Sequence, residues 1–290
     1  MTTTTVRLDG REVPRIGFGA MQLRDVPQET ASSVLRRAVE LGVRLFDTAA
    51  FYGPGTVNER IRAALAPFAD DIVIATKVGA TSVPGPAELV LAQRPEELRA
   101  EVERNLRTLG AERLDVVHLR RGDLPPGLIA EGDQLVPVED QLAELVALRD
   151  AGTIGAIGLS AASTAVLRAA LPAGLASVQN AHNVLSRATE DQLDLCREHG
   201  VVWMPYFPLG SAFDGMPSVV RAPAVLAVAG EVDATPGQVA LAWLLAQAPA
   251  VAPVPGTRSV AHLEENVAAA AVQLTPEQLG ALDAAVPPTE

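Results

Sequence analysis

The most constraining feature of this 290-residue sequence is a regular alternation of short apolar segments with longer amphipathic ones. Eight short segments have the composition of strands, at residues 15–19, 44–47, 72–77, 114–120, 156–160, 177–180, 201–206 and 251–255. Segments with helical periodicity lie at 29–41, 57–66, 95–108, 138–151, 163–170, 189–199, 236–247 and 259–270. Strands that alternate with helices are typical of parallel α/β folds. Eight such units predict a closed (β/α)8 TIM barrel, a single domain over residues 1–290.

Turn and capping residues indicate where these elements begin and end. The pair Asp9-Gly10 between two alternating segments predicts an N-terminal β-hairpin over residues 4–14. A Thr-x-x-Gln spacing is typical of helix starts, and it occurs at Thr189/Gln192, Thr235/Gln238 and Thr275/Gln278. The last of these predicts a C-terminal helix and tail over residues 275–290. Glycines suited to end helices stand at Gly42, Gly110, Gly152 and Gly200.

Charge and composition exclude several classes of function. The sequence has 23 Lys and Arg against 35 Asp and Glu, a net charge of −12, so we expect no nucleic-acid partner. The single cysteine, Cys196, allows neither an internal disulfide nor a multi-cysteine metal site, and we expect no metal. Prolines interrupt the uncharged run 239–257, which predicts a buried helix and strand rather than a membrane span. The N-terminal residues do not form a signal-peptide pattern, so we expect a cytoplasmic protein; its oligomeric state does not follow from the sequence.

Polar residues end three neighbouring strands of the predicted barrel. Asp47, Lys77 and Arg120 end the second, third and fourth strands, and Tyr52 follows Asp47 closely. Long connections follow the third, fourth and seventh strands, at residues 79–94, 121–137 and 210–222. In a (β/α)8 barrel the carboxyl ends of the strands carry the active site. We therefore expect the four side chains to meet at that mouth of the barrel.

Lys77 is the only lysine in the sequence, and a lysine has a tunable pKa that an arginine lacks. A free tyrosine has a pKa of about 10, and a neighbouring ammonium lowers that pKa by favouring the phenolate. We therefore expect Tyr52 to act as a general acid, with Lys77 lowering its pKa and Asp47 holding Lys77 by an ion pair. The alternatives are a chance lysine in a lysine-poor composition and an ordinary interfacial tyrosine.

Seven segments in order along the chain carry a family likeness: 15–23 (RIGFGAMQL), 46–53 (FDTAAFYG), 75–77 (ATK), 158–160 (GLS), 178–180 (VQN), 206–210 (YFPLG) and 255–266, which begins PGTR and ends HLEEN. Together they resemble the aldo-keto reductases. The resemblance implies a (β/α)8 barrel that uses NADPH without a Rossmann motif. The sequence indeed lacks a strand–GxGxxG–helix unit.

The resemblance also implies a role for each matching residue. Tyr52 would be the general acid, tuned by Lys77 and Asp47. Ser160 and Gln179 would hold the nicotinamide carboxamide, and Tyr206 would stack on its ring. Further cofactor contacts are implied for Gly19, Met21, Pro208, Leu209, Gly256, Thr257, Arg258, His262, Glu265 and Asn266. Of these, 256–258 would line the site of the adenosine 2′-phosphate at a helix N-terminus, and 265–266 would hold the adenine, unless they form a solvated helix face.

The sequence departs from the family at two positions. The fourth catalytic position is usually histidine, and here it is Arg120, which we expect to face the substrate oxygen or an anionic group beside it. His118 would lie on the same strand face, about 6.6 Å deeper, where packing suits it better than catalysis; which of the two replaces the histidine stays open. Ala161 stands where many members have asparagine, so one cofactor hydrogen bond would be lost or replaced.

Several of these segments resemble the bacterial pyridoxal reductase branch of the family. The expected function is NADPH-dependent reduction of a small aldehyde or ketone to the alcohol, with pyridoxal to pyridoxine as the preferred reaction. The alternatives are a keto-sugar or natural-product ketone as substrate, or an NADPH-binding regulatory protein with little turnover. The direction of the reaction in the cell and the strictness for NADPH over NADH do not follow from the sequence.

Overall fold

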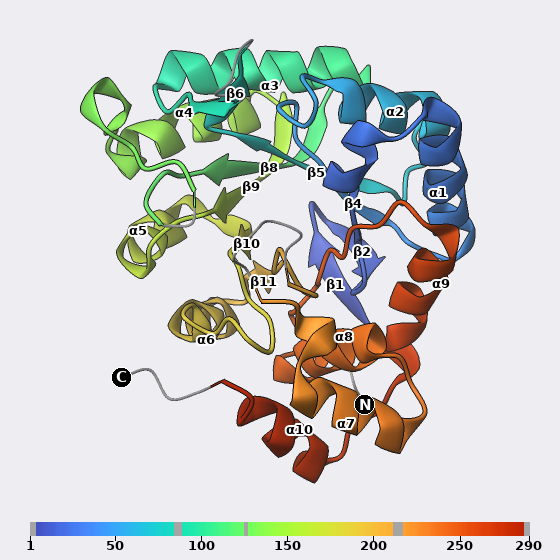
Figure 1. The fold of residues 1–290 in the computed structure, drawn as a ribbon. Helices are drawn as coiled ribbons and strands as arrows, with labels where there is room; N and C mark the ends of the chain where they lie inside the picture. Colours follow the sequence, from blue (N-terminus) through green and yellow to red (C-terminus); the bar gives the residue numbers. More distant parts are fainter. Residues whose placement is uncertain (1–3, 84–88, 125–126, 211–216, 287–290) are drawn as a thin grey trace.

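Parallel strands form the centre of the molecule in a computed structural model that describes residues 4–83, 89–124, 127–210 and 217–286 (Figure 1). Within these residues a seven-stranded sheet has the order β11-β10-β9-β8-β5-β4-β3. Its strands are β3 (Phe18–Gly19), β4 (Leu45–Asp47), β5 (Val73–Val78), β8 (Leu114–Arg120), β9 (Ile154–Ser160), β10 (Leu175–Gln179) and β11 (Val202–Trp203). All neighbouring pairs are parallel, so the carboxyl ends of the strands lie at one edge.

The eighth predicted strand, 251–255, closes this sheet into a barrel without forming a regular strand. On one side it pairs with Trp203 of β11. On the other side, the N–H groups of Gly17 and Gly19 donate to the carbonyls of Pro253 and Pro255, at 3.0 and 3.1 Å. Prolines have no N–H to donate, so a complete ladder cannot form here. The prediction of a regular strand is wrong at this point, whereas the predicted barrel is confirmed.

Helices surround the barrel (Figure 1). They are α1 (Gln28–Glu40), α2 (Thr56–Leu65), α3 (Pro95–Leu109), α4 (Val138–Asp150), α5 (Thr164–Ala170), α6 (Glu190–His199), α7 (Pro223–Val232), α8 (Pro236–Gln247), α9 (Val260–Ala268) and α10 (Pro276–Asp283). Short 3-10 helices are η1 (Ala20–Asp25), η2 (Gly132–Gln134), η3 (Leu171–Ala173), η4 (Val219–Arg221) and η5 (Ala269–Ala271). Over the described part of the chain, none of the helices is both long enough and apolar enough to span a bilayer.

Two elements in the connections were not predicted. The hairpin of β6 (Ala80–Ser82) and β7 (Leu89–Leu91) occupies the loop expected to be irregular at 79–94. Helix α7 follows the loop 210–222 and has an almost wholly apolar sequence, which lacks the polar face that marks an amphipathic helix. Residues 84–88, 125–126 and 211–216 of the three long loops, and the end of the C-terminal tail at 287–290, lie outside the described residues.

The capping predictions hold at two of three helix starts. Thr235 with Gln238 and Thr275 with Gln278 form reciprocal capping boxes at α8 and α10. At α6 the prediction is wrong, because the Thr189 hydroxyl donates instead to the carbonyl of Ala181 at 3.0 Å. Its expected partner, Gln192, instead accepts from Asn180 Nδ2 and donates to the carbonyl of Ala162 in a buried cluster beside β10. All four predicted terminal glycines adopt positive φ angles.

The N-terminal hairpin closes the amino end of the barrel. Strands β1 (Thr5–Leu8) and β2 (Arg11–Pro14) pair as predicted and lie across the centre of the ring in Figure 1. Val6, Leu8 and Val13 pack against side chains that point into the barrel, including Leu45 and Val116. Since this end is plugged by apolar side chains, the carboxyl end remains as the accessible mouth.

Candidate active site

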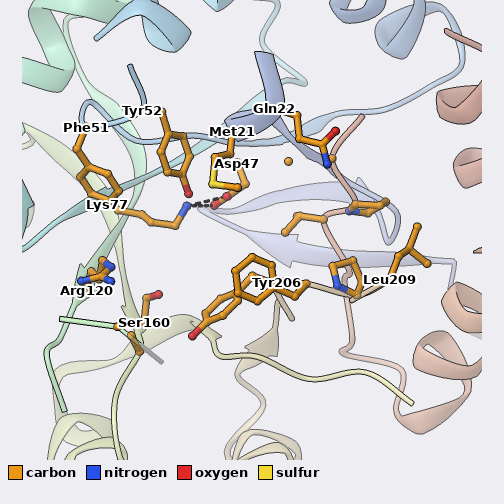
Figure 2. Close-up of a pocket in the computed structure, with 18 of the residues that line it drawn as sticks. Met21, Gln22, Asp47, Phe51, Tyr52, Lys77, Arg120, Ser160, Tyr206 and Leu209 are labelled. Atoms are coloured by element: carbon orange, nitrogen blue, oxygen red, sulfur yellow. Dashed lines mark hydrogen bonds and ion pairs between the residues drawn. The ribbon is translucent and has the colours of Figure 1, made fainter. Parts of the chain in front are cut away.

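A cavity of about 490 Å³ opens at the carboxyl ends of the strands (Figure 2). The predicted site residues that line it are Gly19, Met21, Asp47, Tyr52, Lys77, Arg120, Ser160, Tyr206, Pro208, Leu209 and Gly256. The structure therefore brings the four catalytic candidates together with much of the predicted cofactor set. These residues come from strand ends that are far apart in the sequence, and the parallel sheet places them at one edge.

Lys77 lies at the floor of the cavity and is held by Asp47. Its Nζ donates to Asp47 Oδ1 at 2.8 Å and Oδ2 at 2.6 Å, and to the carbonyl of Thr48 at 3.1 Å. Lys77 and Asp47 are 4% and 5% exposed. The ammonium nitrogen lies 5.1 Å from the centre of the Tyr52 ring, and the Tyr52 hydroxyl points toward it (Figure 2). A fixed cation therefore stands beside the phenol.

Burial decides the protonation of Tyr52. It raises the pKa of Tyr52 above the ordinary value, and this outweighs the Lys77 ammonium, which lowers the same pKa. The expected net lowering of the tyrosine pKa is therefore wrong, although Lys77 acts in the expected direction. Burial lowers the pKa of Lys77, but Asp47 and Tyr52 together more than compensate, so this pKa is raised. At neutral pH the phenol is protonated and the lysine is charged.

Buried amides behind β4 and β5 hold the backbone around Lys77. Asn105 of α3 donates through Nδ2 to the carbonyl of Lys77 at 3.3 Å. Its Oδ1 accepts from Thr76 Oγ1 at 2.6 Å and from Asn58 Nδ2 at 2.9 Å. Asn58 Oδ1 in turn accepts from Thr48 Oγ1 at 2.7 Å. Both asparagines are fully buried, so helices α2 and α3 fix the strand ends that carry the ion pair.

Arg120 and His118 lie on the same strand, but they have different surroundings. Arg120 ends β8 and points into the cavity (Figure 2), and among the described residues its buried Nη1 has no hydrogen-bond partner. Burial lowers the pKa of Arg120, but a guanidinium remains charged at neutral pH. His118 is fully buried inside the barrel, with Nε2 at 2.9 Å from Ser177 Oγ, and burial lowers its pKa to about 4. Of the two, Arg120 is the one that lines the cavity.

Gln179, a predicted cofactor residue, is fully buried behind Asp47 and is not among the residues that line the cavity. Its Nε2 donates to Asp47 Oδ1 at 2.7 Å, while its buried Oε1 has no partner among the residues that the structure describes. Ser160 and Ala161 line the adjoining wall. Ala161 has a φ of 51°, in the left-handed region that asparagine tolerates better than alanine. An unpaired buried carbonyl oxygen is costly, so Gln179 Oε1 is suited to accept an N–H from a ligand.

The residues predicted for the adenosine end lie at and after the start of α9, beyond those that line the cavity. Thr257 is buried, and its Oγ1 accepts from the N–H of Ser259 at 3.0 Å. Arg258, His262 and Glu265 are exposed, and Asn266 is buried. The structure does not bring these five residues to the catalytic candidates. They follow directly on Gly256, where the cavity ends.

Part of the cavity lining was not predicted. These residues are Gln22, Phe51, Leu89, Gly127, Ala161 (noted only as a departure), Phe207, Gly210, Val254 and Pro255. Most of them adjoin predicted residues in the same segments, and this proximity in the sequence could have identified them as lining residues. Leu89 and Gly127 come from the long loops after β5 and β8, whose paths the sequence does not give. Among the described residues, no cluster of three or more His, Cys, Asp or Glu could hold a metal ion.

Comparisons with known proteins agree with this architecture. The model of the Aldo/keto reductase family matches residues 15–287. A pyridoxine 4-dehydrogenase of Escherichia coli strain K12 is 39% identical over an alignment of 295 positions, gaps included, that covers 98% of each chain. An uncharacterized oxidoreductase of Schizosaccharomyces pombe is 35% identical, over 96% of this chain and 89% of that one.

Solved structures show the same fold. An aldo-keto reductase from Klebsiella pneumoniae in complex with NADPH has a TM-score of 0.81 and 26% identity, over 98% of this chain and 95% of that chain. A second structure from the same organism, in complex with NADP and acetate, has a TM-score of 0.82 and 25% identity, over 99% and 98% of the two chains. With the barrel, the cavity and the full-length sequence match in agreement, the chain is an oxidoreductase that belongs to the aldo/keto reductase family.

Proposed function

We propose that this enzyme reduces small aldehydes and ketones to alcohols with NADPH, and that Tyr52 donates the proton. The observation that carries the proposal is the Lys77 ammonium, bound to both oxygens of Asp47 and lying beside the Tyr52 hydroxyl. A protonated phenol in this setting can give its proton to a carbonyl oxygen, because the adjacent cation stabilises the phenolate that remains. Asp47 keeps Lys77 charged and in place during this transfer.

The wall beside Asp47 fits a nicotinamide ring. Ser160 lines this wall. Gln179, which lies behind Asp47, has a buried Oε1 with no partner among the described residues, and this oxygen could accept the carboxamide N–H if the wall opens to it. The Tyr206 ring faces the cavity, where it can stack on a flat ring (Figure 2). NADPH, when bound, supplies the hydride for the carbonyl carbon. The complexes of the Klebsiella pneumoniae relatives with NADPH and NADP support this assignment.

The remaining cofactor residues continue from the cavity to α9. The cavity wall between the catalytic candidates and α9 is formed by Gly19, Met21, Pro208, Leu209 and Gly256. Thr257 and Arg258 stand before α9, where backbone N–H groups and the helix dipole favour an anion. The exposed guanidinium of Arg258 is suited to a 2′-phosphate, which favours NADPH over NADH. His262, Glu265 and Asn266 on α9 would contact the adenine end.

Pyridoxal is the substrate that we propose. It carries a ring hydroxyl beside its aldehyde, and the ionised oxygen can pair with the Arg120 guanidinium while the aldehyde oxygen meets Tyr52. Arg120 lines the cavity, and its buried Nη1 has no hydrogen-bond partner among the described residues, which supports this pairing. The likeness to a pyridoxine 4-dehydrogenase over nearly the whole chain points to the same substrate pair.

The test measures NADPH consumption with pyridoxal and with benzaldehyde, for the wild type and for Tyr52→Phe. We expect turnover of pyridoxal that falls by about three orders of magnitude in Tyr52→Phe, since a positioned general acid contributes about 10²–10⁴-fold. The phenylalanine keeps the ring but removes the proton, so NADPH binding, followed by fluorescence, should be retained. Turnover of benzaldehyde alone would refute pyridoxal but keep the reductase. Tight NADPH binding with no turnover of any aldehyde would contradict the proposed activity and favour a regulatory role.

A further inference from the structure

Arg120 has an unusual position for a charged side chain. Arg120 lines the cavity, and its buried Nη1 has no hydrogen-bond partner among the described residues. Arg120 is the last residue of β8, so the position of its backbone sets where the side chain begins. On one side this backbone is tied to β9, where the N–H of Arg121 donates to the carbonyl of Ser160 at 2.8 Å.

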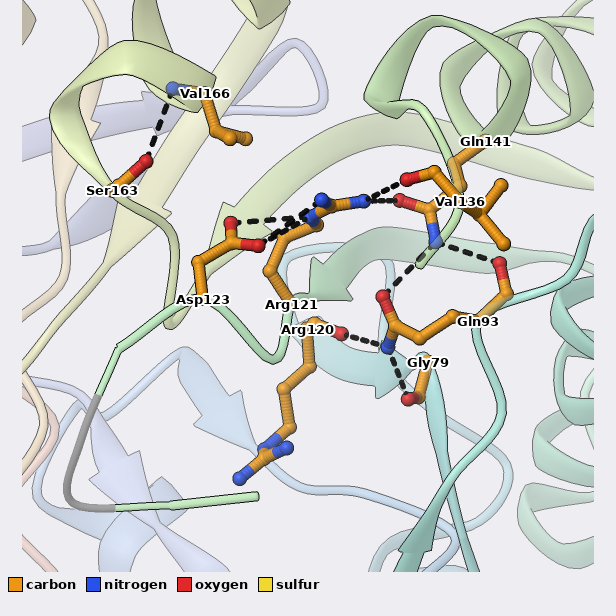
Figure 3. A network of polar contacts seen from close by, with 9 residues as sticks. All are labelled: Gly79, Gln93, Arg120, Arg121, Asp123, Val136, Gln141, Ser163 and Val166. Atoms are coloured by element: carbon orange, nitrogen blue, oxygen red, sulfur yellow. Dashed lines mark hydrogen bonds and ion pairs between the residues drawn. The ribbon is translucent and has the colours of Figure 1, made fainter. Parts of the chain in front are cut away.

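On the other side a buried glutamine holds Arg120. Gln93 Nε2 donates both to the carbonyl of Arg120, at 2.8 Å, and to the carbonyl of Gly79 at the end of β5 (Figure 3). Gly79 has a φ of +97°, and a Cβ there would lie 2.3 Å from the Arg120 carbonyl oxygen and 2.9 Å from Gln93 Nε2. The two strand ends thus approach closely, and one amide bridges them.

A second buried glutamine orients the first. Gln141 Nε2, from α4, donates to the backbone carbonyl of Gln93 at 2.6 Å and to its Oε1 at 3.0 Å. Gln141 Oε1 accepts from Arg121 Nη1, and the same Nη1 donates to the carbonyl of Val136 at 2.9 Å (Figure 3). Both glutamines are fully buried, and every donor and acceptor of their side chains is used. A fully satisfied buried network has one favoured arrangement and is rigid.

The same network ties down both loops beside Arg120. Gln93 ends the segment that follows β7, whose Leu89 lines the cavity. Arg121 and its ion-pair partner Asp123, at 3.0 Å, begin the loop that brings Gly127 to the cavity. Movement of either glutamine would therefore shift both the guanidinium and the walls around it.

We propose that Gln93 and Gln141 are positioning residues that aim Arg120 at an anionic oxygen beside the substrate carbonyl, and so set the preference of the enzyme for such aldehydes. This inference rests on the proposed function, in which Arg120 contacts the substrate. An ion pair with a guanidinium depends steeply on geometry, since it uses directed N–H groups. The binding of an aldehyde without the anionic group does not depend on the position of the Arg120 guanidinium.

The test is a double-mutant cycle on the ratio of kcat/KM for pyridoxal to kcat/KM for benzaldehyde. Gln93→Met keeps the length of the side chain and removes the amide, and we expect the ratio to fall about tenfold, through KM for pyridoxal, as a misplacement below 1 Å can produce. Arg120→Met should lower the ratio at least as far. Adding Gln93→Met to Arg120→Met should lower it no further, because the guanidinium that Gln93 positions is gone.

A matched control is Gln192→Met on α6. Gln192 is also buried, and its Nε2 donates to the carbonyl of Ala162 at 3.2 Å and to Thr164 Oγ1 at 3.3 Å rather than to the backbone of Arg120. It should affect the two aldehydes equally. Gln93→Glu, which keeps the shape but cannot donate to two carbonyls when ionised, measures the same ratio if Gln93→Met does not fold. The comparison can be repeated without pyridoxal by using salicylaldehyde and 4-hydroxybenzaldehyde, which differ in the ring position of the hydroxyl relative to the aldehyde.

The outcomes separate the inference from the proposed function. An unchanged ratio in Arg120→Met would refute the substrate assignment and the positioning role with it. A lowered ratio in Arg120→Met, with an unchanged ratio in Gln93→Met, would refute the positioning role alone. Equal losses for both aldehydes in Gln93→Met, or a full further loss in the double variant, would show a general structural role and overturn the inference.

Discussion

Replacing Lys77 by methionine removes the cation beside Tyr52 while keeping a side chain of similar length. In the native site Nζ makes two hydrogen bonds to Asp47, at 2.6 and 2.8 Å, and one to the carbonyl of Thr48, at 3.1 Å. In the variant, Asp47 keeps the Gln179 Nε2 donor at 2.7 Å but loses its ion-pair partner. The buried carboxylate, on a side chain that is 8% exposed, is then left without a compensating charge.

The expected loss in the free energy of unfolding is about 3–5 kcal/mol, the usual cost of breaking one side of a buried ion pair. The unpaired carbonyl of Thr48 contributes part of this loss. In the double variant Lys77→Met/Asp47→Asn the uncompensated charge is removed as well. We expect the double variant to be more stable than Lys77→Met by about 2 kcal/mol or more. Aldehyde turnover should fall about 10²–10⁴-fold in both, because the cation that stabilises the Tyr52 phenolate is absent.

Urea unfolding followed by tryptophan fluorescence measures the stability, since Trp203 and Trp243 are fully buried. Circular dichroism on the same samples checks that both probes report one transition. Arg107→Met is the control, because Arg107 pairs with Glu103 at 3.8 Å on the surface, where both side chains are exposed. That change should cost less than about 1 kcal/mol.

Two results would refute this reasoning. A loss below about 1 kcal/mol in Lys77→Met would show that the buried pair contributes no more than a surface pair. A double variant less stable than Lys77→Met would show that the charge left on Asp47 is not the source of the cost.

Three further predictions concern packing and pH. Gly158→Ala should lower the free energy of unfolding by about 1–3 kcal/mol, because a Cβ there would lie 2.3 Å from His118 Cδ2. Equal urea midpoints for wild type and variant would show that His118 moves aside freely. Burial lowers the pKa values of His118 and His182 to about 4, from 6.5 in the unfolded chain. The two neutral imidazoles therefore stabilise the fold above pH 6.5, and the free energy of unfolding should decrease by about 3 kcal/mol for each histidine as the pH falls toward 4. Urea unfolding between these pH values measures this loss, and His118→Asn should reduce it. Since the pKa of Tyr52 is raised, the rate of aldehyde reduction should stay constant into mildly alkaline solution. The rate of the reverse oxidation, which needs the phenolate, should rise about tenfold per pH unit. A fall in the reduction rate centred near neutral pH would contradict the raised pKa.

Much of the fold could be predicted because local patterns agree with it. The apolar runs at 72–77 and 114–120 became β5 and β8 with boundaries shifted by at most one residue. Capping boxes at Thr235 and Thr275 placed the starts of α8 and α10. Two misses share a cause, since α7 and the β6–β7 hairpin lack the periodicity on which such predictions depend. The other two, at 251–255 and at Thr189, arise from prolines without an N–H and from a competing tertiary hydrogen bond.

The site could be predicted only in part. Strand ends in a parallel barrel meet at one edge, so Asp47, Lys77 and Arg120 had to be neighbours once the strands were placed. The sign of the Tyr52 pKa shift could not be obtained this way, because it depends on how far burial outweighs one nearby charge. The role of Gln93 could not be predicted from the sequence either, because it is a buried residue in a loop without a recognisable motif.

The sequence by itself therefore determined that Asp47, Lys77 and Arg120 stand together at the mouth of the barrel, through strand periodicity and the order of strands and helices. The tertiary structure alone decided how those groups are held: Lys77 between Asp47 and Thr48, Arg120 with its Nη1 unpaired among the described residues, and Gln93 bridging two strand ends. The physical reason is that hydrogen bonds and desolvation depend on distances of a few ångströms between segments far apart in the chain. No local pattern specifies such distances, whereas a pattern of apolar residues is enough to specify the barrel.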